Sequence, residues 1–281
     1  MRGHHRPVKC SVRIVGSALL LGIVAVTVEL GSAASCFFLK SRAPFLLYTP
    51  PTVSRAAWEN YVKVRDPVVG WPTTDALNSD GYDASGSRPI PAFANPGKEC
   101  MTLYGDSFTY ASEVAHEAAW GNLLAESLGC RVGNFGVGGY GTDQALLRFE
   151  SNESDVARVS ILGIIPHNVL RNINQYRYLL DMRSVLGFKP RFVLAGNDLR
   201  LVPLPKPTFE ELALLASNPG QLLPHEAFLP GTRLGPVPLK FPYTSSCSSS
   251  HCFIARSEIG CVTNRAGEIS WRGIILPRHD R

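Results

Sequence analysis

Short apolar segments alternate with helix-like segments between residues 100 and 195, and no other feature of this chain constrains its fold as strongly. Four segments have the length and apolar content of buried strands, at residues 101–104, 131–135, 159–165 and 191–195. Apolar residues at helical spacing occupy residues 113–128, 142–149 and 169–186. Strands that alternate with helices through short connections build a parallel, doubly wound sheet. We therefore expect an α/β fold with such a sheet.

Chemistry-bearing residues follow the first three of these strands. Ser107 comes after a tight Gly105-Asp106 turn, a glycine-rich loop spans residues 136–141, and Asn168 follows the third strand. Ligands of a parallel sheet bind at the carboxyl ends of its strands, where we expect these segments to meet. A serine hydroxyl becomes an effective nucleophile when a base accepts its proton and donors stabilise the oxyanion. We predict Ser107 as the nucleophile, with a glycine N–H and the Asn168 amide as oxyanion donors.

Two of these segments resemble a known family. The sequence Leu-Tyr-Gly-Asp-Ser-Phe-Thr at residues 103–109 is similar to the first block of the SGNH hydrolases, the GDSL-type esterases and lipases. Residues 134–144 resemble the second block, in which Gly139 matches the family's oxyanion glycine. Residues 166–169 keep only the asparagine of the third block, Asn168. The resemblance covers residues 98–200 and implies a flavodoxin-like SGNH hydrolase fold with serine esterase activity. We expect neither a cofactor nor a metal.

A second asparagine segment also looks like the third block. Gly196-Asn197-Asp198 lies 58 residues after Gly139, at the end of the fourth predicted strand. Asn168 lies 29 residues after Gly139, at the end of the third. The spacing and strand order of the family favour Asn168.

The general base of the family cannot be assigned from this sequence. The family's last block, DxxH, supplies that histidine and the aspartate that orients it, and it does not occur here. His279-Asp280 has the wrong order and spacing, and residues 113–116 fit a solvated helix face. His167 lies next to the predicted site and can line the cleft. We expect His225 and His251 at the surface, because both fall in irregular segments.

The C-terminal part of the chain lacks the pattern of the preceding part. Residues 244–281 show neither the fifth strand nor the final helix that the resemblance implies. We interpret this tail as irregular and aberrant or truncated, and expect a fold that is incomplete at its C-terminus. We expect an exported hydrolase that cleaves ester bonds in a small molecule, lipid or glycan. A catalytically inactive envelope protein that retains the fold and a carbohydrate O-acyltransferase are the alternatives.

A basic segment and a long apolar run open the chain. Four positive charges within residues 1–13 precede an apolar run at 14–39, which is long enough to span a bilayer as a helix. An uncleaved signal-anchor fits better than a signal peptide cleaved after Ser32-Ala33-Ala34, because apolar residues continue through Leu39. A lipoprotein box at residues 33–36 is a poorer fit. Each reading places the rest of the chain on the periplasmic or extracellular face.

Composition predicts the domain boundaries and the partners. We expect a cytoplasmic basic segment at 1–13, a transmembrane signal-anchor at 14–39, a Pro/Gly-rich tether and lead-in at 40–98, a hydrolase-like domain at 99–243 and the tail at 244–281. The formal net charge is +5, and the first segment carries +4 of it, so no nucleic-acid-binding surface is expected. The expected partners are a membrane, through the N-terminal helix, and an ester substrate.

The cysteine spacing favours a disulfide over a metal site. No two of the seven cysteines have the CxxC spacing of a zinc site. Cys100 and Cys130 each stand directly before a predicted strand, and equivalent positions on neighbouring parallel strands come within bridging distance. Because an exported protein matures in an oxidising compartment, we predict a disulfide between them, with two buried thiols as the alternative.

Overall fold

The computed structural model of the chain describes residues 8–42, 46–247 and 272–276. The chain divides into two compact units, one of Met1–Thr49 with Pro230–Cys261 and the other of Pro50–Leu229 with Val262–Arg281. The larger unit contains all three predicted site residues. The expectations that fall outside the described residues concern residues 1–7, His251, His279-Asp280 and most of the tail.

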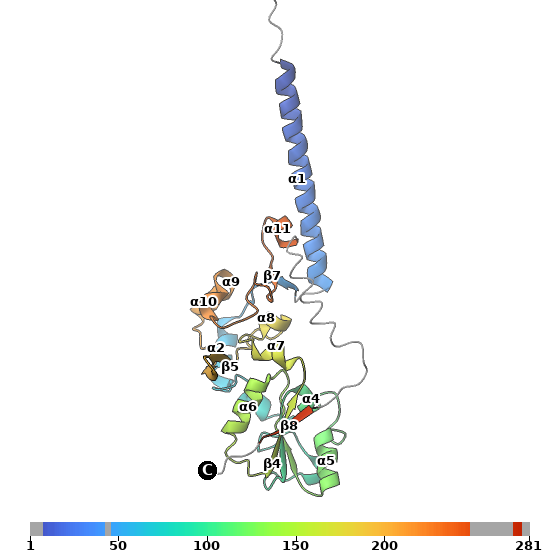
Figure 1. Ribbon diagram of the computed structural model, residues 1–281, viewed down its shortest axis with the longest axis vertical. Helices are drawn as coiled ribbons and strands as arrows, with labels where there is room; N and C mark the ends of the chain where they lie inside the picture. Colours follow the sequence, from blue (N-terminus) through green and yellow to red (C-terminus); the bar gives the residue numbers. More distant parts are fainter. Residues whose placement is uncertain (1–7, 43–45, 248–271, 277–281) are drawn as a thin grey trace, which may run out of the picture. The chain divides into compact units, whose positions relative to one another are not determined.

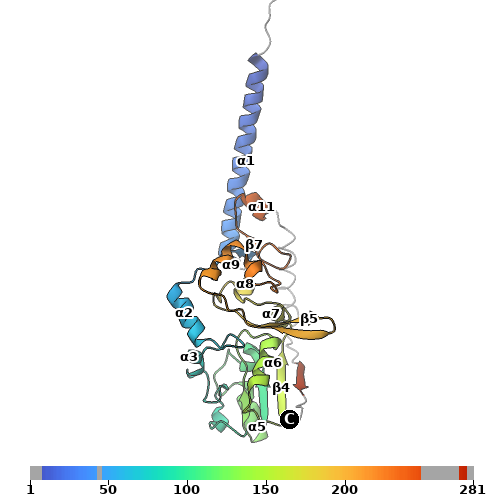
Figure 2. The same ribbon diagram turned by 90° about the vertical axis from the view of Figure 1, so that its left-hand side faces the viewer.

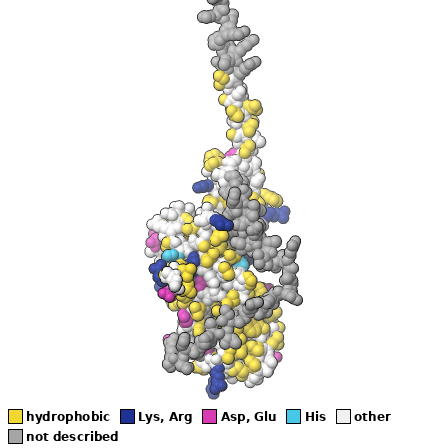
Figure 3. Space-filling model, in the orientation of Figure 1, with side chains coloured by type: hydrophobic (Ala, Val, Ile, Leu, Met, Phe, Trp, Pro, Cys, Tyr) yellow, Lys and Arg dark blue, Asp and Glu magenta, His cyan; other side chains and the backbone are white. Residues whose placement is uncertain are grey.

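The smaller unit is built on one long helix, α1 (Val8–Arg42) (Figure 1). Within its segment Ile14–Arg42, a window of 18 residues reaches a mean hydropathy of 2.1, so the segment is long and apolar enough to cross a membrane. Figure 3 shows hydrophobic side chains along the part of α1 that it draws in colour. The apolar helix predicted from the sequence is therefore present. The unit also holds a two-residue parallel pairing of β1 (Leu47–Tyr48) with β7 (Val237–Pro238), and a short helix, α11 (Tyr243–Cys247).

Glu29 lies where α1 begins to contact other residues of its unit. Residues 14–28 are all exposed, whereas Cys36, further along, is completely buried. The Glu29 carboxylate accepts hydrogen bonds from the backbone N–H groups of Tyr243 and Thr244, the latter at 3.2 Å. Because these N–H groups begin a helix and have no partner within it, the contact satisfies both them and the one acidic residue of the apolar run.

The larger unit contains a sheet with the strand order β3-β2-β4-β8. The strands β2 (Met101–Tyr104), β3 (Val132–Asn134) and β4 (Val159–Ile164) are parallel, which confirms the first three predicted strands to within two residues. The fourth strand, β8 (Arg272–Leu276), lies in the tail, where no strand was expected, and pairs antiparallel with β4. The fold is therefore mixed α/β, and its sheet is not parallel throughout.

The fourth predicted strand does not join this sheet. It is β5 (Arg191–Ala195), which pairs antiparallel with β6 (Asp198–Val202) in a separate hairpin (Figure 2). Gly196 and Asn197 form the turn, so the second asparagine segment belongs to a hairpin and not to a strand end of the main sheet. Two loop residues of this type between apolar runs are a hairpin signal, and the expectation of a fourth parallel strand was wrong because it overlooked that signal.

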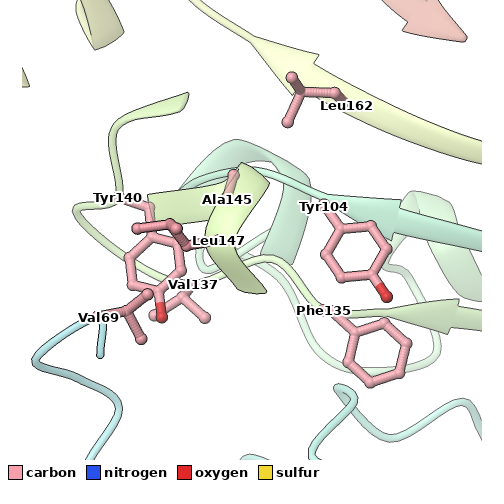
Figure 4. Packing of buried hydrophobic residues seen from close by; sticks show 8 residues of the cluster. All are labelled: Val69, Tyr104, Phe135, Val137, Tyr140, Ala145, Leu147 and Leu162. Atoms are coloured by element: carbon pink, nitrogen blue, oxygen red, sulfur yellow. The ribbon is translucent and has the colours of Figure 1, made fainter. Parts of the chain in front are cut away.

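Two helices cover opposite faces of the sheet (Figure 1). Leu103 packs in a cluster with Ala125 of α5 (Trp120–Leu128), whereas the next residue, Tyr104, packs in a cluster with Ala145 of α6 (Thr142–Ser151). Successive side chains of a strand point to opposite faces, so these neighbours define the two sides. In Figure 4, Tyr104 lies against Phe135, and the two rings stack with centroids 5.2 Å apart.

Two of the predicted helices are shorter in the structure. The helix expected at 113–128 begins only at Trp120, because Ala111 has left-handed backbone angles and the Arg88 guanidinium binds the carbonyl groups of Tyr110, Ala111 and Val114. The helix expected at 169–186 is replaced by α7 (Asn168–Asn172) and α8 (Tyr178–Asp181). The helix α6 begins at its predicted residue, Thr142, with Gly141 as its cap residue.

The lead-in expected as a tether belongs in large part to the larger unit. Residues 50–98 lie in the same compact unit as the sheet. Arg131, which precedes β3, forms buried ion pairs with Asp83 and with Glu99, the latter at 3.0 Å, and these pairs fasten the lead-in to the sheet. The remaining elements of the unit are α2 (Arg55–Val64), α3 (Thr74–Leu77), η2 (Pro91–Phe93), α4 (Ser107–Tyr110), η3 (Glu210–Ala213), α9 (Leu214–Ser217) and α10 (Pro219–Leu222).

Cys100 and Cys130 are joined by a disulfide, with their Cα atoms 6.1 Å apart, as predicted. The bridge closes a loop across a sequence separation of 30 residues. Replacing both cysteines by serine is expected to lower the free energy of unfolding by about 3–4 kcal/mol, because the unfolded chain regains its loop freedom. Urea titration of both proteins measures the change. A reductant should destabilise the native protein and leave the double variant unaffected; two free thiols in the denatured native protein would refute the bridge.

Candidate functional site

Ser107 is the first residue of α4, directly after the turn that ends β2. Gly105 makes this turn possible, since a Cβ there would overlap the Thr109 hydroxyl and lie 3.0 Å from the carbonyl oxygen of Gly163. The Asp106 side chain caps α4 by accepting the N–H of Phe108 at 2.9 Å. Ser107 is half-buried, and its hydroxyl forms no hydrogen bond with any residue that the structure describes. The hydroxyl is therefore held at a strand end without a competing partner.

Asp106 connects the three strand ends that the sequence predicts to converge. Its Oδ2 accepts hydrogen bonds from Asn168 Nδ2 at 3.1 Å and from Arg171 Nη1 at 2.7 Å. The same two donors also reach the carbonyl oxygen of Tyr140 in the glycine-rich loop, at 3.1 and 2.9 Å. All four residues are buried. Asp106 directly precedes Ser107, and Tyr140 directly follows Gly139. These two residues and Asn168 thus form one polar network.

The glycine-rich loop is held from its other side by the lead-in. Trp71 Nε1 donates to the carbonyl oxygen of Gly138 at 3.0 Å, and the Tyr140 hydroxyl donates to the carbonyl oxygen of Trp71 at 2.5 Å. Gly139 has φ +81, a backbone conformation that residues with a Cβ rarely adopt. These contacts fix the loop in a shape that depends on glycine at position 139.

Asn168 uses its whole side chain within the network. Its Oδ1 accepts the N–H of Ile165 at 2.6 Å, while its Nδ2 donates to Asp106 and to Tyr140. Only 2% of the residue is exposed. The side chain therefore positions the strand ends in this structure, and its action as an oxyanion donor stays a prediction that requires it to exchange one of these acceptors.

His167 is half-buried beside this network, at the beginning of α7. Burial lowers the pKa of His167 below its usual value, the positive charges of Arg171 and Arg177 lower it further, and the Asp106 carboxylate acts in the opposite direction. An imidazole with a lowered pKa is neutral at pH 7 and can accept a proton.

The other described histidines have different surroundings. His116 lies outside the helix that was expected to carry it, and its Nδ1 accepts a hydrogen bond from Arg88 Nε at 3.1 Å. His225 is half-buried in an irregular segment, where its carbonyl oxygen binds Arg191. Within the described residues, no histidine is hydrogen-bonded to Ser107.

A cleft of about 610 Å³ lies beside Gly139. Its walls include Trp71 from the lead-in, Gly138 and Gly139 from the glycine-rich loop, and Arg177, Asp181 and Arg183 from the segment around α8. Ser107 does not line it. No group of three metal-ligating side chains occurs among the described residues.

Three residues that shape the site were not identified from the sequence. Arg171 lies three residues after Asn168, so the two share one face of a helical turn, and this spacing alone could have revealed it. Trp71 and Arg88 come from the lead-in, where no local pattern indicates a contact with a loop so far along the chain.

Neither a scan against protein-family models nor searches of curated proteins and solved structures found a match to this chain.

Proposed function

We propose that this chain is an SGNH-type serine hydrolase that cleaves ester bonds. The observation that carries the proposal is the arrangement around Ser107, whose hydroxyl has no hydrogen-bond partner among the described residues at the end of β2. Asp106, Asn168 and Arg171 lock the three neighbouring strand ends together around it. A preorganised serine beside a glycine-rich loop is suited to acyl transfer, because the loop can present N–H groups to the oxyanion.

The proposed reaction has two steps. The Ser107 oxygen attacks the carbonyl carbon of the ester, the bond to the alcohol oxygen breaks, and the alcohol leaves with the proton that the serine has lost. Water then attacks the acyl-serine, which releases a carboxylic acid and restores the hydroxyl. The Gly139 N–H is the proposed donor to the oxyanion of both steps.

His167 is the proposed proton acceptor. Its lowered pKa keeps the imidazole neutral at pH 7, and it interacts electrostatically with Asp106, the residue next to the nucleophile. It also directly precedes Asn168, whose amide binds Asp106 at 3.1 Å. These relations support His167 over His116, because Arg88 already occupies the Nδ1 atom of His116.

The proposed location is the outer face of a membrane. The helix α1 contains a segment long and apolar enough to cross a bilayer, and a basic segment precedes it in the sequence. Positively charged flanks remain in the cytoplasm, which orients the larger unit outward. A disulfide in that unit fits an oxidising compartment.

Covalent labelling tests the proposed nucleophile. An alkyl fluorophosphonate loses fluoride on attack by an activated serine, so the full chain in detergent should gain one phosphonyl group, located on Ser107 by peptide mass spectrometry. Ser107→Ala should not be labelled. Ser112→Ala is the matched control, because Ser112 is an exposed serine whose N–H binds the Ser107 carbonyl oxygen at 3.0 Å, and it should be labelled like the native protein. Absence of labelling in the native protein would contradict the proposal and favour an inactive envelope protein.

A further inference from the structure

We propose that the cleft beside Gly139 binds an acidic sugar, with Arg177 pairing with its carboxylate. This inference rests on the proposed function, because it assigns the class of ester that the Ser107 site would receive. The cleft has a volume of about 610 Å³, which lies within the range of pockets for small ligands.

The cleft wall carries unbalanced positive charge. Arg177, Arg183 and Asp181 all line it, which gives two positive charges against one negative charge. Arg177 Nε donates to Asp181 Oδ2 at 3.0 Å, whereas Arg177 Nη1 is buried and has no hydrogen-bond partner among the described residues. Guanidinium groups form paired hydrogen bonds with carboxylates, so an anion that reached this nitrogen would satisfy a donor that the protein leaves unused.

The aromatic wall of the cleft is rigid. Trp71 is fixed at both its indole N–H and its carbonyl oxygen, by Gly138 and Tyr140. Its ring also packs edge-on against the ring of Tyr140, with centroids 5.8 Å apart. A fixed indole presents an apolar surface without further loss of conformational freedom, and two hydroxyl-bearing residues, Thr73 and Ser184, line the same cleft. Apolar surface beside hydroxyl groups suits a sugar ring.

Gly139 connects this cleft to the proposed reaction. A Cβ built on Gly139 would lie 3.8 Å from Trp71 Cζ2 and 3.9 Å from Arg177 Cζ. The proposed oxyanion residue therefore lies next to both the Trp71 ring and the Arg177 guanidinium. A ring held on Trp71 with its carboxylate at Arg177 would contact the loop that is proposed to receive the ester oxygen.

Binding measurements on Ser107→Ala test this inference apart from the chemistry. Isothermal titration with methyl glucuronide and methyl glucoside compares two sugars that differ at the charged position. We expect the glucuronide to bind about ten-fold more tightly, as one charge-assisted contact provides. Arg177→Gln should remove this preference and Arg177→Lys should retain part of it. Arg200→Gln removes an equal charge from the exposed hairpin and should leave the preference unchanged.

The outcomes separate the two proposals. Equal affinity for the two sugars, no binding of either at millimolar concentration, or an equal effect of Arg200→Gln would overturn the acidic-sugar assignment. A thermal unfolding curve shows whether Arg177→Gln folds. If Arg177→Gln does not fold, the glucuronide preference of Arg177→Lys tests the assignment instead. A preference for the glucuronide together with a failure of fluorophosphonate labelling would retain the binding site and reject the hydrolase.

Discussion

Ser107→Ala is expected to lower the rate of ester hydrolysis by about 10³-fold or more, because the acyl-serine can no longer form and only binding and oxyanion stabilisation remain. The fold should be unaffected, since the Ser107 hydroxyl makes no hydrogen bond with the described residues. The loss should therefore appear in kcat with an unchanged melting temperature. This combination distinguishes a missing nucleophile from a damaged protein.

Release of nitrophenolate from 4-nitrophenyl acetate measures this rate for the full chain. Ser112→Ala should hydrolyse the ester at the native rate, because the one hydrogen bond of its hydroxyl to a described residue is to the Ser107 carbonyl oxygen, at 3.3 Å. His167→Gln should also lose most of the activity. Retention of the native rate by this variant would mean that another residue accepts the proton. Native-like hydrolysis by Ser107→Ala would show that Ser107 is not the nucleophile.

Lys189→Met is expected to lower the free energy of unfolding by about 3–5 kcal/mol. The Lys189 ammonium is completely buried and donates to Asp143 Oδ2 at 2.5 Å. It also donates to the carbonyl oxygens of Arg171, Asn174 and Pro190, at 3.0, 3.0 and 2.8 Å. Burial lowers the pKa of Lys189 and raises that of Asp143. The Asp143 charge acts to raise the pKa of Lys189, and the Lys189 charge acts to lower that of Asp143, so each reduces the effect of burial on the other. Removing the ammonium leaves a buried carboxylate and three carbonyl groups without this donor.

Chemical denaturation of the larger unit measures this loss, and a second substitution identifies its cause. Asp143→Leu in the Lys189→Met background removes the stranded carboxylate, so the double variant should be more stable than Lys189→Met alone. The ester-hydrolysis rate should also fall in Lys189→Met, because the Arg171 carbonyl is one of the acceptors and Arg171 binds Asp106. A loss of less than about 1 kcal/mol would mean that the pair is no more important than a surface salt bridge.

The three parallel strands of the sheet were predictable from the sequence, because their local apolar pattern determines them. The apolar runs gave β2, β3 and β4, and their order along the chain placed Cys100 next to Cys130. The strand β5 was expected in the parallel sheet but forms a hairpin with β6, because an apolar run of five residues fits a parallel or an antiparallel strand equally well. Only the Gly196-Asn197 turn distinguishes the two.

The motif residues of the candidate site were predictable from the sequence, but the residues that hold them in place were not. Ser107, Gly139 and Asn168 follow strand ends as expected, and Asp106 joins the segments that carry them. The structure uses the Asn168 amide to bind Asp106 and Tyr140, which no motif could have indicated. Long-range partners such as Trp71 carry no local signal, because their contacts are set by packing and not by periodicity.

The buried Arg88 has a consequence for the order in which the chain becomes structured during synthesis. Its guanidinium holds three carbonyl groups of residues 110–114, in the loop that follows the proposed nucleophile. Ribosomes deliver the N-terminal side first, so Arg88 and Trp71 have left the exit tunnel before the segments that they hold. The loops around Ser107 therefore depend for their shape on residues that precede them in the chain.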